Sequence, residues 1–287
     1  MWVKNLTKIG LGVGVAASTT YFVMDRRKRT TGIAMAAENI FNFPAQPEPF
    51  VRTKWDYNWD RREPESLLKP TKKPLDEFND NSNIKRLEKL KSKATRHLIL
   101  VRHGQYEMNT SRQHRKLTPL GREQAIITGK RLEELGYNYA HMTNSTMIRA
   151  EETADLIATS LPKDLERKSD SMLEEGAPYP PEPPSVGNWK PDAVFLTDGT
   201  RIEAAFRKYF HRAHYDQEKD SYEIIVCHGN VIRYFLCRAL QLPPEAWLRF
   251  QVAHSSISWF VIRPSGRITV RHVGDIGHIP VDKVTYN

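Results

Sequence analysis

The chain has 287 residues, of which 39% are hydrophobic and 27% charged, and its mean hydropathy of −0.58 restricts any membrane contact to a local segment. Its net charge of +9 favours anionic substrates or surfaces, and no zinc-finger, RNP or basic-zipper pattern indicates a nucleic-acid partner. The two cysteines, Cys227 and Cys237, lie in an apolar stretch and are interpreted as buried thiols in a reducing compartment, not as a disulfide.

Residues 9–24 form an uncharged apolar segment, with Lys4 and Lys8 before it and four basic residues, 26–29, after it. As a helix these 16 residues would be about 24 Å long, a little short of a hydrocarbon core. Flanking lysines and arginines can reach the interface, and bilayers can thin locally. The sequence therefore predicts a single-pass membrane anchor over 1–29, with its basic end on the non-translocated side.

The same segment could be a secretory signal that is cleaved near Ala34-Met35-Ala36. The basic run 26–29 argues against this alternative, because the residues before a cleavage site are normally uncharged. We therefore expect an uncleaved anchor. Gly10 and Gly14 form a G-x-x-x-G pair that could bring two such helices together, although in so short a segment the spacing is more often incidental.

Residues 30–93 show little periodic pattern and are predicted to form a linker. Within it, residues 55–60 (WDYNWD) concentrate aromatic side chains in polar surroundings. These side chains could form a docking surface or fold back on the core of their own domain, and the sequence leaves both interpretations open. Further on, Ile84, Leu87 and Leu90 repeat at helical spacing among lysines and predict a short amphipathic helix.

Residues 94–287 have the sequence pattern of a regular α/β domain. Apolar runs predict strands at 97–101, 223–227, 257–262 and 267–272. Helices are predicted over 118–135, 147–160, 201–215 and 231–240, and the proline-rich stretch 172–184 is predicted to be a loop. Strands that alternate with helices indicate a three-layer α/β/α sandwich around a mostly parallel sheet.

Two strand ends carry the same short motif. The first strand runs directly into Arg102-His103-Gly104, and a second one, about 125 residues later, runs into His228-Gly229-Asn230. In open parallel sheets, ligands bind beyond the carboxyl ends of the strands, so the two histidines are expected to face one pocket. Gly104 and Gly229 would let the backbone approach a bound substrate closely.

Two histidines beside an arginine suit phosphoryl transfer. A neutral imidazole is a competent nucleophile toward phosphorus, so His103 is the candidate nucleophile. Arg102 offers a rigid fork for phosphate oxygens, and so does Arg149 if its helix begins at the same edge of the sheet. Nearby arginines also disfavour protonation of His103. A single histidine at a strand end is more often structural, but the repeated motif and Arg102 favour the catalytic interpretation.

Residues 101–104 resemble the signature of the histidine phosphatase (phosphoglycerate-mutase-like) superfamily, and residues 117–125 and 145–153 resemble its next two motifs. Within the superfamily, residues 55–64, 175–178 and 228–234 resemble the mitochondrial serine/threonine protein phosphatases. The resemblance covers about residues 55–285. It implies the histidine phosphatase fold and a serine/threonine protein phosphatase with little or no mutase activity.

The resemblance also implies roles at the matching positions. His103 would become phosphohistidine, while Arg102, Arg149 and His228 would hold the phosphoryl group. Glu175 would protonate the departing serine or threonine oxygen, since an alkoxide is a poor leaving group. No cofactor is expected.

Glu174 and Asn109 stand at positions where family members differ. Glu174 stands where the family has an arginine, which changes the charge beside the expected general acid. Asn109 lies where mutase-type members have a phosphate ligand, a residue that the protein phosphatases often lack. No H-x-H, H-E-x-x-H or other clustered ligand pattern predicts a metal site.

The resemblance further implies partners and a location. In the family, the motif at 55–60 binds a neighbouring subunit and activates the enzyme, so a homo-oligomer, a dimer or larger, is expected. The residues involved would be Trp55, Asp56, Asn58, Trp59 and Asp60. The partners of the family are phosphoprotein substrates, with a stress-activated MAP kinase kinase kinase among them. The family acts in stress or cell-death signalling or in mitochondrial quality control. The expected location is a mitochondrial membrane, the outer in preference to the inner.

Two alternatives stay open. A mutase or small-molecule phosphatase on the same fold would need a closed, basic, substrate-sized pocket, whereas the proline-rich stretch 177–184 suggests an open rim. A membrane scaffold with weak activity would not need the complete set of candidate catalytic residues described above.

Overall fold

The computed structural model describes residues 54–68, 80–108, 111, 114–185 and 190–286. The expected membrane segment 9–24 and the candidate phosphate ligand Asn109 lie outside these residues. Within the described ranges, no helix is both long enough and apolar enough to span a bilayer. Trp55–Asn287 form one compact unit.

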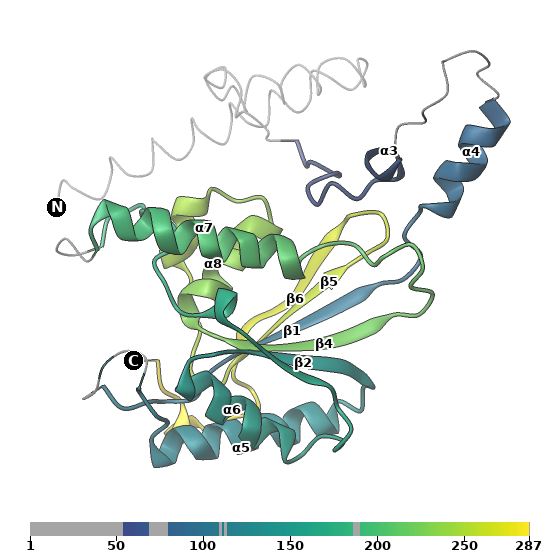
Figure 1. Cartoon of the computed structure of the whole chain (residues 1–287). Coiled ribbons are helices and arrows are strands. Elements are labelled where there is room, and N and C mark those ends of the chain that lie inside the picture. The colour runs from purple at the N-terminus through teal and green to yellow at the C-terminus, as the bar shows by residue number, and fades with distance from the viewer. Residues whose placement is uncertain (1–53, 69–79, 109–110, 112–113, 186–189, 287) are drawn as a thin grey trace, which may run out of the picture. The chain divides into compact units, whose positions relative to one another are not determined.

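The unit is built on a six-stranded sheet with the strand order β3-β2-β4-β1-β5-β6 (Figure 1). The strands are β1 (Arg96–Arg102), β2 (Tyr139–Ser145), β3 (Arg167–Asp170), β4 (Ser221–Cys227), β5 (Ile257–Ile262) and β6 (Ile268–Asp275). The first four in the spatial order are parallel, whereas β5 runs antiparallel to β1 and β6 antiparallel to β5. The mostly parallel sheet is confirmed.

Helices lie on both faces of the sheet: α5 and α6 pack on one face, and α7 and α8 on the other (Figure 1). The helices are α3 (Pro64–Leu67), α4 (Asp80–Lys89), α5 (Pro119–Glu134), α6 (Ile148–Ala158), α7 (Asp192–Tyr209) and α8 (Gly229–Ala239). Short 3₁₀ turns occupy Ser171–Leu173, Pro244–Arg249 and Val281–Lys283. The three-layer α/β/α architecture expected from the sequence is therefore present.

The central strands are buried on both faces because alternate side chains point to opposite layers. In β1, Leu98 and Leu100 pack with α7 and α8, while Ile99 and Val101 pack with α5 and α6. All four side chains are buried. This explains why the strand is a continuous apolar run and not an alternating pattern.

Two strands and one helix boundary differ from the expectation. The polar sequences of β2 and β3 did not indicate strands; β3 lies at the sheet edge and is largely exposed. Helix α7 begins at Asp192, earlier than predicted, and ends at Tyr209. Its first half includes Leu196, which is 73% exposed, so that half has no buried apolar stripe for the sequence to reveal.

Residues 55–60 fold back on their own domain, one of the two interpretations left open. Trp55 and Trp59 pack against the core on the α7–α8 side, and Trp59 Nε1 donates a 2.8 Å hydrogen bond to Gly266 O. Asp60 forms a 2.7 Å ion pair with Arg212, and these side chains are only 1% and 5% exposed. The motif therefore belongs structurally to the domain that follows it.

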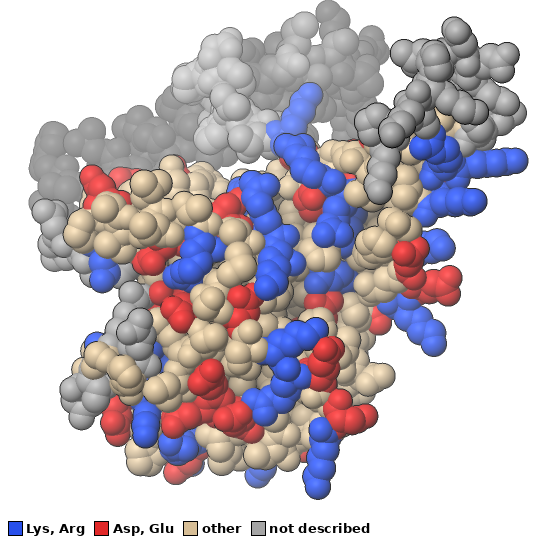
Figure 2. Space-filling model, viewed as in Figure 1, with Lys and Arg blue, Asp and Glu red and all other residues tan. Residues whose placement is uncertain are grey.

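Helix α4 is amphipathic, as expected, and carries a basic surface. Leu87 and Leu90 are half-buried, but Ile84 is 54% exposed. Lys85, Arg86 and Lys89 are exposed on this helix. Figure 2 shows Lys and Arg side chains gathered over this region.

Candidate active site

The two His-Gly motifs meet because β1 and β4 are parallel neighbours in register. Arg102 is paired with Cys227, and His103 N donates a 3.0 Å hydrogen bond to Cys227 O. His103 and His228 therefore leave the sheet side by side at its carboxyl edge, with ring centroids 5.0 Å apart. Both are buried, His103 being 1% exposed.

The hydrogen bonds of His103 determine which nitrogen carries its proton. Nδ1 lies 2.8 Å from Gly104 O, and a carbonyl oxygen can only accept, so the proton is on Nδ1. Nε2 accepts a 3.2 Å hydrogen bond from Nε of Arg149, and a guanidinium can only donate. Burial, with the charges of His228, Arg149 and Arg102 adding to it, holds the pKa of His103 well below its usual value. His103 is thus a neutral imidazole with its lone pair on Nε2.

Arg149 comes from the first turn of α6 and is buried against this imidazole. Its guanidinium carbon lies 5.0 Å from the ring centre of Tyr106, and the same ring meets His103 edge-on at 5.0 Å. The Arg149 hydrogen bond occupies the lone pair of Nε2, so Nε2 could attack another atom only after Arg149 has released it.

Arg102 is held by the end of the chain as well as by the sheet edge. Its Nη1 donates to Val252 O (2.7 Å) and to Tyr286 O (2.8 Å), and its Nη2 to Nε2 of His254 (3.1 Å). Nδ1 of His254 in turn lies 2.9 Å from Oγ1 of Thr285. Burial lowers the pKa of Arg102 to about 10, although the carboxylate of Glu175 opposes the shift. Arg102 therefore remains a cation at neutral pH.

His228 is positioned by a third parallel strand. Its Nε2 lies 2.8 Å from the hydroxyl oxygen of Ser145, the last residue of β2. His228 is also the N-cap residue of α8, so the amino end of that helix begins directly at the site. A helix amino end favours bound anions, which adds to the attraction for phosphate.

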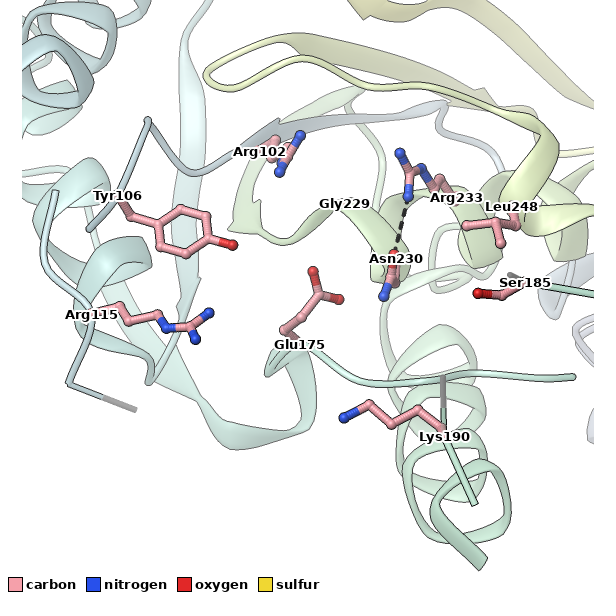
Figure 3. A pocket seen from close by; sticks show the side chains of 10 residues that line it. All are labelled: Arg102, Tyr106, Arg115, Glu175, Ser185, Lys190, Gly229, Asn230, Arg233 and Leu248. Atoms are coloured by element: carbon pink, nitrogen blue, oxygen red, sulfur yellow. Dashed lines mark hydrogen bonds between the residues drawn. The ribbon is translucent and has the colours of Figure 1, made fainter. Parts of the chain in front are cut away.

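Glu175 projects into a pocket of about 590 Å³ that opens beside this cluster (Figure 3). Its Oε1 accepts a 3.1 Å hydrogen bond from Gly176 N. Arg201 holds the loop by donating to the carbonyls of Glu174 (2.7 Å) and Glu175 (3.3 Å). The carboxylate of Glu174 accepts a 2.6 Å hydrogen bond from the hydroxyl of Thr146. The residue that departs from the family pattern is thus bound to Thr146 and is not among the residues that line the pocket.

Gly104 and Gly229, the glycines of the two His-Gly motifs, differ in how much space surrounds them. A Cβ on Gly104 would lie 2.4 Å from Gly121 O, so Gly104 is needed for contact with the start of α5 and not for a ligand. A Cβ on Gly229 would meet its nearest neighbour, Nε of Arg102, at an ordinary 3.4 Å. Gly229 does line the pocket, next to Asn230.

Several residues of the site were not predicted from the sequence. Ser145 was missed as the end of a strand because β2 is too polar to be recognised. Tyr106 and His254 lie outside helices and strands. There, no periodic pattern in the sequence indicates which way a side chain points. Arg233 could have been found, because it lies four residues after Gly229 and so shares its helix face. It lines the same pocket.

Comparisons with known proteins identify the family. A profile described as the histidine phosphatase superfamily, branch 1, matches residues 98–177 and 187–275. The Caenorhabditis elegans protein named serine/threonine-protein phosphatase Pgam5, mitochondrial, is 45% identical over 287 residues, covering 99% of each chain. The Xenopus tropicalis protein named serine/threonine-protein phosphatase PGAM5, mitochondrial, is 52% identical over 238 residues, covering 83% of this chain and 84% of that one.

The fold has counterparts among solved structures. Bacillus stearothermophilus YhfR superposes with a TM-score of 0.51 and 21% sequence identity, over 64% of this chain and 100% of that one. Similarity at this level supports the fold alone.

Proposed function

Since the chain belongs to the histidine phosphatase superfamily, we propose that it is a protein-serine/threonine phosphatase that carries the phosphoryl group on His103. The observation that carries the proposal is the state of His103: a buried, neutral imidazole whose lone pair is on Nε2, between Arg149 and His228. The names of the curated relatives support serine and threonine phosphoproteins as substrates.

In the first step, Nε2 of His103 attacks the phosphorus of a phosphoserine or phosphothreonine. The new N–P bond forms as the P–O bond to the side-chain oxygen breaks. In its protonated form, Glu175 would give its proton to that oxygen, so that a neutral alcohol leaves. The Nδ1–H bond to Gly104 O keeps Nε2 unprotonated and would orient the ring during attack.

In the second step, water attacks the phosphorus of phosphohistidine. The carboxylate of Glu175 accepts a proton from the water, the N–P bond breaks, and inorganic phosphate leaves with His103 neutral again. Arg102, Arg149 and His228 would stabilise the charge on the phosphoryl oxygens in both steps. In phosphoryl transfer, such positioning and electrostatic stabilisation provide most of the catalysis.

Trapping the intermediate tests the proposal. Rapid acid-free quenching of the full chain with a labelled phosphopeptide should capture acid-labile phosphate on His103, which is then released to water and not to added phosphoglycerate. His103→Asn should form no phosphoenzyme and show no turnover. Full turnover by His103→Asn would refute the mechanism.

Glu175 is tested separately by the choice of leaving group. Glu175→Gln should lower turnover of a phosphoserine peptide by a factor on the order of 10²–10⁴, the usual contribution of a general acid. Hydrolysis of p-nitrophenyl phosphate should fall much less, because its phenolate leaves without a proton. Equal losses on both substrates would remove the general-acid assignment.

We also propose that the chain is a homo-oligomer in which residues 55–60 activate catalysis. The resemblance supports this role, and the contacts of Trp59 and Asp60 with their own domain are ones that two chains could exchange. Replacing Trp55 and Trp59 by alanine should reduce the assembly size on gel filtration together with turnover. Reduced size with full turnover would separate assembly from activity.

A mitochondrial membrane location is proposed, the outer membrane in preference to the inner, with residues 9–24 as anchor. Carbonate extraction of isolated mitochondria tests the anchor, because the chain should stay in the membrane fraction after the wash. Protease added to the intact mitochondria tests the side, because a domain anchored in the outer membrane and facing outward should be digested. The proposed signalling role, with a stress-activated MAP kinase kinase kinase among the substrates, rests on the resemblance alone.

A further inference from the structure

The pocket beside His103 carries more positive charge than one phosphoryl group needs. Its lining includes four cations and a single carboxylate: Arg102, Arg115, Lys190, Arg233 and Glu175. A phosphorylated side chain brings about two negative charges, and Arg102 and the buried Arg149 already lie at the expected phosphoryl position. The positive charge of the other lining residues therefore favours a substrate that carries further negative charge.

Arg233 lies in the pocket at a useful distance from the reaction. It follows Gly229 by one turn of α8, so its backbone is roughly 5–6 Å further from the end of β4. Figure 3 shows Arg233 with Asn230 on one side of Glu175, and Tyr106 with Arg115 on the other. Since an extended peptide advances about 3.3 Å per residue, Arg233 faces a position one or two residues from the phosphorylated one.

Arg233 is also held in place with one donor left unsatisfied. Its Nη1 donates a 3.1 Å hydrogen bond to Asn230 Oδ1, and Asn230 Nδ2 donates to Gly176 O (2.9 Å), next to Glu175. Its Nε is buried and has no hydrogen-bond partner within the described part of the chain. Buried donors are usually paired, so this one indicates a place for an acceptor that the chain itself does not supply.

We propose that Arg233, oriented by Asn230 and assisted by Lys190, binds a second anionic group of the substrate. The substrates are then phosphorylated segments with an acidic side chain, or a second phosphate, within two residues of the phosphate that is removed. A guanidinium fork suits carboxylate and phosphate equally well. The inference rests on the proposed phosphatase function and adds the substrate class.

Matched phosphothreonine peptides test the subsite on the full chain. The residues on both sides of phosphothreonine are aspartate, asparagine, lysine or phosphoserine, the rest being identical. We expect kcat/KM to be about tenfold higher for the aspartate peptide than for its asparagine isostere, and the advantage to shrink as salt is added. The phosphoserine peptide shows whether a second phosphate is preferred over a carboxylate.

Variants then assign the effect to Arg233. Arg233→Gln should remove most of the aspartate-to-asparagine ratio, Arg233→Lys should restore part of it, and Arg233→Glu should shift the preference toward the lysine peptide. Arg207→Gln is the matched control, because Arg207 is 64% exposed on α7 and pairs with Glu203. It should leave both activity and the ratio unchanged.

A binding measurement separates this inference from the phosphatase proposal. Fluorescence anisotropy on the His103→Asn chain reports peptide affinity without turnover, and the aspartate peptide should bind about tenfold more tightly than the asparagine peptide. Equal affinities, or an advantage that Arg233→Gln retains in full, would overturn the subsite. If the affinities differ but no peptide is hydrolysed by the unmodified chain, the subsite stands and the phosphatase function fails.

Discussion

The guanidinium of Arg149 is hydrogen-bonded to the nucleophilic nitrogen of His103, with 3.2 Å between Nε and Nε2. Burial is the main cause that holds the pKa of His103 below its usual value, and the nearby cation of Arg149 adds to it because it disfavours protonation of the ring. The contact also places a guanidinium, the expected phosphate-binding group, at the lone pair of the proposed nucleophile. One side chain thus protects the nucleophile at rest and is positioned to bind the phosphoryl oxygens once it moves.

Arg149→Ala should lower kcat/KM by about 10- to 150-fold, the equivalent of one charge-assisted hydrogen bond of about 1.5–3 kcal/mol. It should also raise the pKa of His103, since a cation that disfavours protonation is lost, and the acid limb of the kcat/KM profile should move to higher pH. Arg131→Ala is the control, because Arg131 is partly exposed on α5 and pairs with Glu134. An unchanged pH profile would show that Arg149 does not act on His103.

Thr285 should matter for catalysis although it lies near the end of the chain. Thr285→Val removes the hydroxyl that contacts Nδ1 of His254 (2.9 Å) and accepts from Nε2 of Gln124 (2.9 Å). His254 then loses the group that orients it toward Arg102, and we expect kcat to fall about tenfold with little change in stability. Thr285→Ser keeps the hydroxyl and should restore turnover. Equal losses in both variants would contradict the hydroxyl's role.

Asp60 should contribute strongly to stability. Its ion pair with Arg212 is buried, and although burial raises the pKa of Asp60, hydrogen bonds from Arg212 outweigh it and the pKa lies below its usual value. Asp60→Ala leaves a buried guanidinium unpaired, which should lower the free energy of unfolding by about 3–5 kcal/mol.

Asp56→Ala is the matched control within the same motif. Asp56 pairs with Arg61 at 3.7 Å on the surface, where an ion pair contributes about 0–1 kcal/mol. Urea unfolding of the two variants should therefore differ clearly. Similar midpoints for Asp60→Ala and Asp56→Ala would mean that Asp60 is not buried in solution.

Stability should decline as the pH falls from about 6.5 to about 4, partly through His211. Burial, together with the charge of Arg96, lowers the pKa of His211 to about 4. Below the unfolded-state pKa of about 6.5, the unfolded chain binds a proton that the folded chain does not, so each step down in pH favours unfolding. The loss from His211 would reach up to about 3 kcal/mol.

His211→Gln should flatten this part of the stability curve, measured as the free energy of urea unfolding at several pH values. His272→Gln, at an exposed position on β6, serves as the control and should follow the unmodified chain. If His211→Gln also follows it, another group is responsible for the acid sensitivity.

Local patterns were sufficient for the parts of the fold that have a strong period or a continuous apolar run. The runs before His103 and His228 identified β1 and β4, and the rule for parallel sheets placed both histidines at one edge. Polar elements were not predicted, because β2 has a mixed sequence and the first half of α7 faces solvent. In such elements the stability comes from pairing with neighbours, which a single segment does not reveal.

By itself, the sequence determined the α/β class, the resemblance to the family and the two histidines at the strand ends, because these depend on residues adjacent in the chain. Only the tertiary structure decided what surrounds the nucleophile. Arg149 reaches His103 across 46 residues, and Tyr286 O reaches Arg102 across 184. The resemblance placed Arg149 at the site, but which atoms meet depends on loop paths and side-chain rotamers that the packing of the whole domain selects.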